Sequence, residues 1–105
     1  KDIELSFKTG NTSLLSRYLN NSVSLSMPGT ESKTLSKDQT IQLINDFFKK
    51  NPSKQFSIIH QSTAYDNSIY LIGDYKTQNK VYRVMLYIRK TDDTYLIYQL
   101  GIEAD

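Results

Sequence analysis

His60 is the only histidine in this chain of 105 residues, and its imidazole is the side chain best suited to move protons near neutral pH. Strand alternation would place it on one face with Phe56, Ile58 and Ser62, which is a largely apolar surface. A histidine there is more often a packed, hydrogen-bonded residue than a general base, and no motif surrounds it. The chain has no cysteine and no carboxylates at ligand spacing, so we expect no metal and no cofactor.

Tyr70 and Asp74 form a second candidate pair, because they occupy alternate positions on one face of a predicted strand with Ile72 between them. Together they would offer a phenol and a carboxylate to one ligand. The structural alternative is that Tyr70 packs against a neighbouring strand while Asp74, next to Gly73, faces solvent. Both interpretations stay open on the sequence alone.

Arg83 lies in a predicted strand whose two faces differ. On its own face, Tyr87 can make a cation–π contact with Arg83 or Arg89 if that face is exposed to solvent. The same face suits a dimer interface, because tyrosine, methionine and arginine are enriched at interfaces. In a third interpretation Arg83 turns inward and anchors an anionic ligand, and the strand register decides among the three. The more apolar face, which we expect to contact the helices, carries Tyr82, Val84, Leu86 and Ile88.

The charge balance points to no particular partner. Thirteen basic and eleven acidic residues give a net charge of +2, and the only tight basic cluster is Lys49, Lys50 and Lys54. We interpret this cluster as the solvated end of a helix, and we expect no nucleic-acid partner because no basic stripe carries interleaved aromatic residues. No apolar run approaches the ~20 residues that cross a bilayer, so no transmembrane segment is expected. The sequence begins at Lys1 rather than at methionine, so we expect that a preceding segment was removed.

One of the elements that must position these side chains is a helix with clear start and stop signals in the sequence. Ser36 and Gln39 form a predicted capping box at its start, and apolar residues recur at helical spacing as far as Phe48. The sequence Asn51-Pro52 then ends the helix. These signals predict a helix that packs one apolar stripe onto the rest of the domain.

Two shorter helices are predicted before it. The first ends at Thr9-Gly10, and the second carries the apolar face that includes Leu15 and Tyr18. A left-handed turn at Asn20-Asn21 then leads into a strand over residues 22–27, where polar and apolar residues alternate. We interpret its serines as the solvent-exposed side of a sheet.

After the long helix the sequence changes to four long strand candidates. Their connections, among them Tyr65-Asp66-Asn67, are short and turn-forming, which predicts an antiparallel meander. Gly73 lies in mid-strand and predicts a bulge there. We therefore predict one α+β domain over residues 1–105, with N-terminal helices packed on a strongly curved antiparallel sheet. The four strands run over about Lys54–Ala64, Ser68–Thr77, Lys80–Lys90 and Thr94–Glu103.

Five stretches carry a family resemblance that covers nearly the whole chain: Gly10…Leu14-Leu15, Leu35-Ser36-Lys37-Asp38-Gln39, Asp46-Phe47-Phe48-Lys49-Lys50-Asn51-Pro52, Phe56-Ser57-Ile58-Ile59-His60-Gln61 and Ile72-Gly73…Tyr82-Arg83-Val84. With the order of the elements, they resemble the cone-shaped domains of the nuclear-transport-factor-2-like superfamily (cystatin-like, SnoaL-like). More closely, the chain resembles a small bacterial domain family of unknown function within that superfamily. These motifs mostly specify the fold, because they are caps, core positions and bulges.

The resemblance implies export to the periplasm or cell envelope, and it brings no established activity. In isomerases of the superfamily an aspartate base and a tyrosine oxyanion donor line the cone. Tyr70 and Asp74 are formally similar to that pair, but their positions do not match its catalytic pattern. Many cones of the superfamily pair through their sheets, which favours a homodimer.

Three functional hypotheses follow. The first is non-catalytic binding of a small ligand or a protein partner in or around the cone, and the alternative is a lyase- or isomerase-type enzyme with Asp74 or His60 as base. A third is a purely structural homodimer whose cone is filled by phenylalanines, which would leave no pocket. The residues expected to form a binding site are Tyr18, His60, Tyr70, Asp74 and Arg83. The phenylalanines expected to fill the cone are Phe7, Phe47, Phe48 and Phe56.

Overall fold

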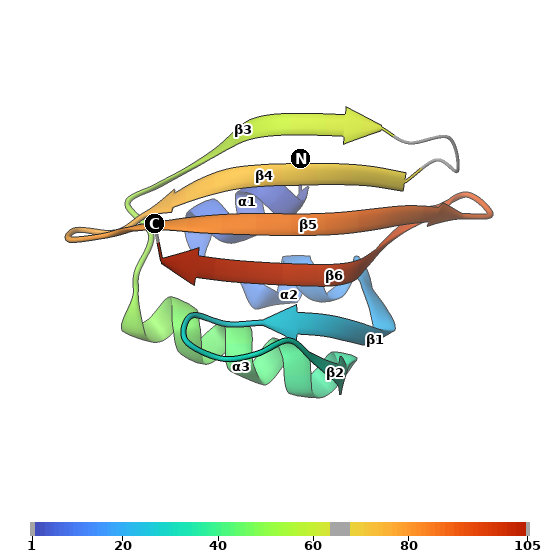
Figure 1. The fold of residues 1–105 in the computed structure, drawn as a ribbon, viewed down its shortest axis with the longest axis horizontal. Helices are drawn as coiled ribbons and strands as arrows, with labels where there is room; N and C mark the ends of the chain where they lie inside the picture. Colours follow the sequence, from blue (N-terminus) through green and yellow to red (C-terminus); the bar gives the residue numbers. More distant parts are fainter. Residues whose placement is uncertain (1, 64–67, 105) are drawn as a thin grey trace.

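Figure 1 shows a computed structural model of the chain, which describes residues 2–63 and 68–104. In this part of the chain, three helices lie on one face of a six-stranded sheet with the strand order β2-β1-β6-β5-β4-β3. The predicted α+β class, with helices packed on a curved sheet, is confirmed. The helices are α1 (Asp2–Thr9), α2 (Thr12–Ser16) and α3 (Lys37–Lys50). The strands are β1 (Leu19–Ser26), β2 (Lys33–Ser36), β3 (Gln55–Thr63), β4 (Ser68–Lys76), β5 (Val81–Thr91) and β6 (Thr94–Ala104).

Strands β3 to β6 follow one another as the predicted antiparallel meander. Strand β1 lies beside β6 and runs parallel to it, a pairing of distant segments that the sequence did not indicate. The predicted left-handed turn at Asn20-Asn21 is wrong, because pairing with β6 begins at Leu19 and both asparagines lie within β1. The predicted strand end at Ala64 and the turn over Tyr65-Asp66-Asn67 lie outside the described residues.

Helix α3 has the predicted caps. The Gln39 N–H donates to the Ser36 hydroxyl (3.2 Å), and the Ser36 N–H donates to the Gln39 side-chain oxygen (3.1 Å). These two bonds satisfy backbone groups that a helix start leaves open. At the other end, the Asn51 N–H and its side-chain amide both donate to the Phe47 carbonyl (2.8 and 3.1 Å). The helix is therefore fixed at both ends while it packs its apolar side onto the sheet.

The space between the helices and the sheet is filled by aromatic rings. Phe7 of α1 stacks on Phe56 of β3 with ring centroids 5.0 Å apart, and Phe48 of α3 stacks on Tyr75 of β4 at 5.8 Å. Phe47 meets Tyr82 of β5 edge to face at 5.0 Å. All of these side chains are buried. We call this helix-covered side of the sheet the inner face and the opposite side the outer face.

A bulge in β3 decides which of its side chains face inward. The pairing with β4 shifts between Ile58 and His60, so the bulge lies on β3, next to the residue that pairs with Gly73. The predicted bulge at Gly73 itself, on β4, is therefore wrong. A Cβ atom at Gly73 would lie 2.6 Å from the Phe56 ring, so the missing side chain makes room for that ring. The predicted common face of Phe56, Ile58 and His60 is also wrong. The extra residue, Ile59, turns His60 to the outer face while Phe56 and Ile58 face the helices.

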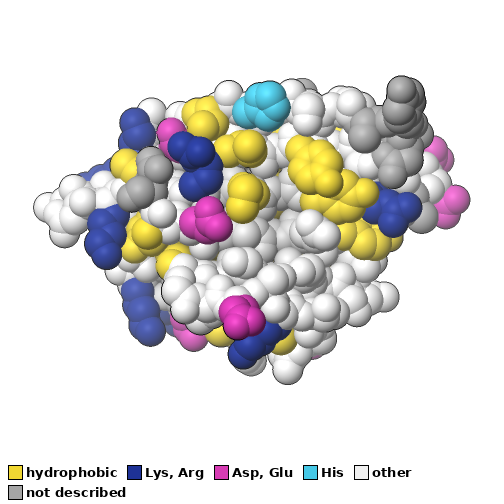
Figure 2. All heavy atoms as spheres, in the orientation of Figure 1, with side chains coloured by type: hydrophobic (Ala, Val, Ile, Leu, Met, Phe, Trp, Pro, Cys, Tyr) yellow, Lys and Arg dark blue, Asp and Glu magenta, His cyan; other side chains and the backbone are white. Residues whose placement is uncertain are grey.

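In the described part of the chain, no helix covers the outer face of the sheet. Figure 2 views this face and shows hydrophobic side chains gathered over its middle. Ile59, Tyr70 and Met85 are 49%, 48% and 40% exposed. Within residues 2–63 and 68–104, none of the helices combines the length and the apolar character that a membrane span requires.

Candidate functional site

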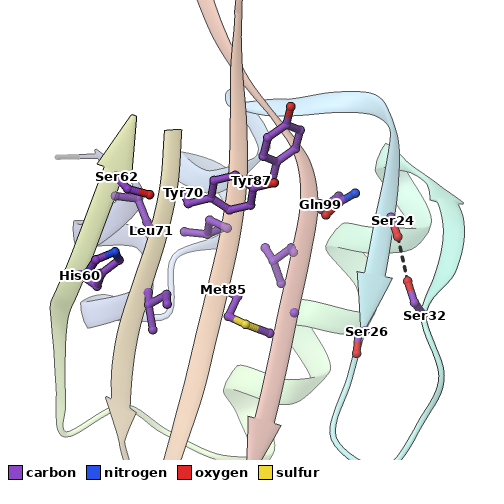
Figure 3. Close-up of a pocket in the computed structure, with 14 residues that line it drawn as sticks. Ser24, Ser26, Ser32, His60, Ser62, Tyr70, Leu71, Met85, Tyr87 and Gln99 are labelled. Carbon is purple, nitrogen blue, oxygen red and sulfur yellow. Dashed lines mark hydrogen bonds between the residues drawn. The ribbon is translucent and has the colours of Figure 1, made fainter. Parts of the chain in front are cut away.

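A groove of about 410 Å³ crosses the outer face of the sheet (Figure 3). It runs from β3 across β4, β5 and β6 to β1 and the segment before β2, so five strands contribute to it. We call it the outer-face groove. Its lining consists of Ser24, Ser26, Ser32, His60, Ser62, Tyr70, Leu71, Ile72, Met85, Leu86, Tyr87, Gln99, Leu100 and Gly101.

The floor of the outer-face groove is apolar and aromatic. Tyr70 and Tyr87 lie opposite each other on β4 and β5, with ring centroids 4.8 Å apart and planes tilted by 41°. The Tyr87 hydroxyl donates to the Ser68 hydroxyl (3.3 Å), which fixes the orientation of that ring. Met85 lies over Gly101, where an added Cβ would sit 3.4 Å from the methionine Cε. Because Gly101 has no side chain, Met85 can lie close to the backbone of β6 and the groove keeps its depth there.

Two polar walls border this floor. Figure 3 shows His60 and Ser62 on the β3 side, and Ser24, Ser26 and Ser32 on the β1 side. The hydroxyls of Ser24 and Ser32 are 2.8 Å apart and hydrogen-bonded to each other. Among the described residues that line the groove, none is an aspartate, glutamate, lysine or arginine. The groove therefore offers hydroxyl, amide and imidazole groups around an apolar floor, without a formal charge from a carboxylate or an amine.

His60 is exposed at the edge of this groove rather than packed in an apolar surface. Among the described residues, no group lies at hydrogen-bond distance from its imidazole, so nothing there orients the ring as the partner of a catalytic base would. Within the described ranges, no three side chains of the metal-binding types gather at one place.

Asp74 and Arg83 also lie on the outer face, but neither lines the groove. They are directly opposite each other on β4 and β5, and the Arg83 Nε lies 3.4 Å from the Asp74 Oδ1. The interpretation in which Arg83 points inward as an anchor is therefore wrong. Of the two arginines predicted to contact the Tyr87 ring, Arg89 lies instead over the Tyr98 ring, with its guanidinium 5.3 Å from the ring centroid.

Tyr18 lies on the other side of the sheet, at the mouth of the cone. Its hydroxyl donates to the Asp2 carboxylate (2.6 Å), and this hydrogen bond, with burial and the nearby negative charge, raises the pKa of the Tyr18 phenol. A cavity of about 600 Å³ opens here between α1 and the inner face. Of the five predicted site residues, the structure thus joins His60 and Tyr70 in one groove and pairs Asp74 with Arg83 beside it. It separates Tyr18 from the other four.

Sequence reasoning missed most of the groove. Gln99, Met85 and Gly101 come from β5 and β6, and Ser24 comes from β1, whose parallel pairing with β6 was not predicted. The alternating serines of β1 gave the available signal, because they marked one side of that strand as polar. Which other residues would lie beside them depends on the strand order, and local patterns do not determine it.

Comparison with known proteins places this geometry in a family. A family model described as a domain of unknown function (DUF4783) matches residues 1–103 of the chain. A crystal structure of a DUF4783 family protein from Bacteroides ovatus superposes with a TM-score of 0.92 at 30% identity, over 99% of this chain and 93% of that one. A DUF4783 family protein from Bacteroides fragilis has a TM-score of 0.92 at 27% identity, over 99% and 96%.

A more distant similarity shows the fold alone. A protein of unknown function from Silicibacter pomeroyi, described as NTF-2 like, has a TM-score of 0.73 at 14% identity, over 99% of this chain and 87% of that one. The nuclear-transport-factor-2-like fold expected from the sequence is therefore confirmed. No curated protein sequence matches the chain.

Proposed function

The chain belongs to the DUF4783 family of domains of unknown function, and we propose that it is a non-catalytic binding domain whose outer-face groove holds an uncharged ligand. One observation carries this proposal. The groove joins an apolar, aromatic floor to walls of serine hydroxyls, an amide and an imidazole, and none of its described lining residues is an acid, a lysine or an arginine. Ligand sites commonly combine an apolar surface with a few polar groups that fix orientation.

The chemistry of the lining selects the ligand. A charged ligand would lose its hydration here without meeting an opposite charge, which is unfavourable. A ligand with one apolar face can cover Tyr70 and Met85, while its hydroxyl or amide groups bond to the serines and to Gln99. Tyrosine and serine together suit such binding, because the ring supplies contact area at a low entropy cost and the hydroxyl adapts its hydrogen bonds.

Catalysis finds less support in the same geometry. The alternative enzyme hypothesis needs Asp74 or His60 as a base within reach of a bound ligand. Asp74 lies outside the groove and faces Arg83 at 3.4 Å. His60 reaches the groove, but no described residue orients its ring. Tyr70 is therefore better explained as part of a binding surface than as an oxyanion donor.

A homodimer through the outer face is the second candidate function. Ile59, Tyr70 and Met85 expose large apolar side chains on this part of the molecule, and tyrosine and methionine are enriched at interfaces. A second copy seated there would cover the groove, so the dimer and the ligand exclude each other. Export to the cell envelope stays a prediction of the family resemblance, and fractionation of cells that express the whole gene product tests it.

A native mass spectrum of the purified chain is the first test. A monomer with additional small-molecule mass supports ligand binding in the groove, whereas a bare dimer supports the second candidate. When neither is found, the uncharged probe hexyl glucoside is titrated into the ¹⁵N-labelled chain. Hexanoate and hexylamine serve as charged probes with the same alkyl length. We expect amide shifts at Tyr70, Met85 and Gln99 with the glucoside alone, and equal responses to all three probes would contradict the proposal.

Matched variants locate the site. Gln99→Ala and His60→Ala should each weaken glucoside binding by about fivefold, since each removes one hydrogen-bonding group of the lining. Ser57→Ala is the control, because Ser57 lies on β3 and faces outward opposite Asp74 but does not line the groove. Equal affinities for all three variants would place the ligand elsewhere, for example at the cone mouth beside Tyr18.

A further inference from the structure

Two segments far apart in the sequence meet at one end of the sheet. One is residues 49–55, which comprises the end of α3, its connection to β3 and the first residue of β3. The other is residues 76–80, which comprises the last residue of β4 and the turn to β5. A hollow of about 470 Å³ lies between them. Lys50 and Lys54 line it from the first segment, and Lys80 lines it from the second. We call it the lysine hollow.

The frame of the lysine hollow is held by hydrogen bonds between the two segments. The Lys54 N–H donates to the Lys76 carbonyl (2.7 Å). Two buried tyrosines hold Asn51: the Tyr75 hydroxyl donates to its carbonyl (2.6 Å) and the Tyr82 hydroxyl to its side-chain oxygen (3.1 Å). The lysines therefore project from a fixed backbone, which lowers the entropy cost of bringing them around one ligand.

The charge around the hollow is one-sided. The two segments contain the five lysines at positions 49, 50, 54, 76 and 80, and neither contains an aspartate or a glutamate. The ion pairs of the described residues, Lys8–Glu4 and Arg83–Asp74, involve none of these five. Figure 2 shows several lysine and arginine side chains at the end of the molecule where the β4–β5 turn lies, with acidic side chains nearby that do not line the hollow. These two segments thus hold five of the thirteen basic residues of a chain whose net charge is only +2.

Helix electrostatics explains only part of this arrangement. Lys49 and Lys50 are in the last turn of α3, where a cation stabilises the helix end. That explanation does not extend to Lys54 or Lys80, which lie outside the helix and line the same hollow. The solvated helix end that the sequence suggested therefore accounts for two of the five lysines.

We propose that the lysine hollow binds a phosphate group. Three ammonium groups around a concave surface, without a carboxylate among the lining residues, suit an anion that carries more than one negative charge. None of the described residues that line the hollow is aromatic, so no ring there can stack on a base and the recognised group is the phosphate, not a nucleobase. The phosphate belongs either to a small soluble molecule or to a lipid headgroup. This site is independent of the uncharged outer-face groove.

The test titrates inorganic pyrophosphate into the ¹⁵N-labelled chain at low salt. We expect saturable amide shifts at residues 50, 54 and 79–80, which weaken as the ionic strength rises. In a parallel experiment, the chain is sedimented with vesicles of phosphatidylglycerol and with vesicles of phosphatidylcholine. Pyrophosphate binding indicates a soluble phosphate ligand, and binding to phosphatidylglycerol vesicles alone indicates a headgroup. No response to either overturns the proposal.

Two triple variants with the same change in net charge separate a site from general electrostatics. Lys50→Gln, Lys54→Gln and Lys80→Gln together should weaken the observed binding by at least about tenfold, because each removes a charge-assisted contact. Lys33→Gln, Lys37→Gln and Lys90→Gln together form the control, since these residues do not line the hollow. Equal weakening in the two variants, both with unchanged melting temperatures, would show that only net charge matters and would overturn the site.

Discussion

The two faces of the sheet use the same strands in different ways. On β4, Tyr75 points to the inner face and is fully buried, whereas Tyr70 points to the outer face and is 48% exposed. The ring of Tyr75 contacts phenylalanines of α1 and α3 and the Tyr82 ring of β5, while the ring of Tyr70 touches Tyr87 and solvent. One residue type therefore serves folding on one face and is free to serve binding on the other.

Two glycines show how different the packing of the two faces is. A Cβ at Gly73, on the inner face, would lie 2.6 Å from the Phe56 ring, a distance that atoms do not tolerate. A Cβ at Gly101, on the floor of the groove, would lie 3.4 Å from the end of the flexible Met85 side chain. The inner face around Gly73 is thus filled, and this part of the cone holds rings instead of a ligand. Free volume on the inner side remains at the mouth of the cone beside Tyr18, whereas the outer-face groove lies over the middle of the sheet.

The largest expected effect comes from removing the two tyrosine rings of β4 in turn. Tyr75→Ala should lower the free energy of unfolding by about 4 kcal/mol, because it leaves a cavity in the aromatic core and removes the bond to Asn51. Tyr70→Ala should lower it by about 1 kcal/mol, the value of an exposed ring pair. Urea unfolding measures both, and similar losses would mean that the two faces contribute equally to stability.

The pH dependence of stability tests the burial of Tyr75 without removing its ring. Burial, with a smaller effect of the neighbouring Tyr82, raises the pKa of Tyr75 from 10 to about 12. Between these values the unfolded chain has released the proton and the folded chain still holds it, so stability falls as the pH rises. The full difference corresponds to about 3 kcal/mol. Unfolding measured from pH 9 to pH 12 should show this fall in the natural chain. Tyr75→Phe should remove the part that Tyr75 contributes and leave the fall that comes from the raised pKa of Tyr18.

Alanine substitutions at the two glycines should have smaller effects, on stability at Gly73 and on ligand binding at Gly101. Gly73→Ala should cost about 2 kcal/mol of unfolding free energy, because the new methyl group must displace the Phe56 ring or the Ser57 carbonyl. Gly101→Ala should lower the free energy of unfolding by less than about 1 kcal/mol. It should nevertheless weaken ligand binding, because the new methyl group pushes the Met85 side chain into the groove. Calorimetry of folding and binding separates the two results. A stable Gly73→Ala variant would contradict the close packing of the inner face.

This contrast also explains what the sequence can predict. The caps of α3 and the antiparallel meander are specified by neighbouring residues, and these predictions are confirmed. The groove depends on the strand order, above all on the parallel contact of β1 with β6, which joins residues far apart in the chain. His60 adds a second reason. One extra residue at Ile59 reverses the face of every following side chain of β3, and no local pattern marks that insertion.

The smallest expected effect on stability, and the sharpest test of what covers the outer face, is a pair of charge substitutions. Met85 on the outer face and Leu43 on α3 are 40% and 42% exposed, so an aspartate at either position should cost at most about 1 kcal/mol of unfolding free energy. If two copies pair through the outer face, Met85→Asp should halve the mass seen by light scattering while Leu43→Asp leaves it unchanged. Tyr87→Asp should act like Met85→Asp, because both residues line the groove. Two aspartates facing each other at the centre of an interface are not tolerated. If no substitution changes the mass, the outer face is therefore not a dimer interface and stays available for a ligand.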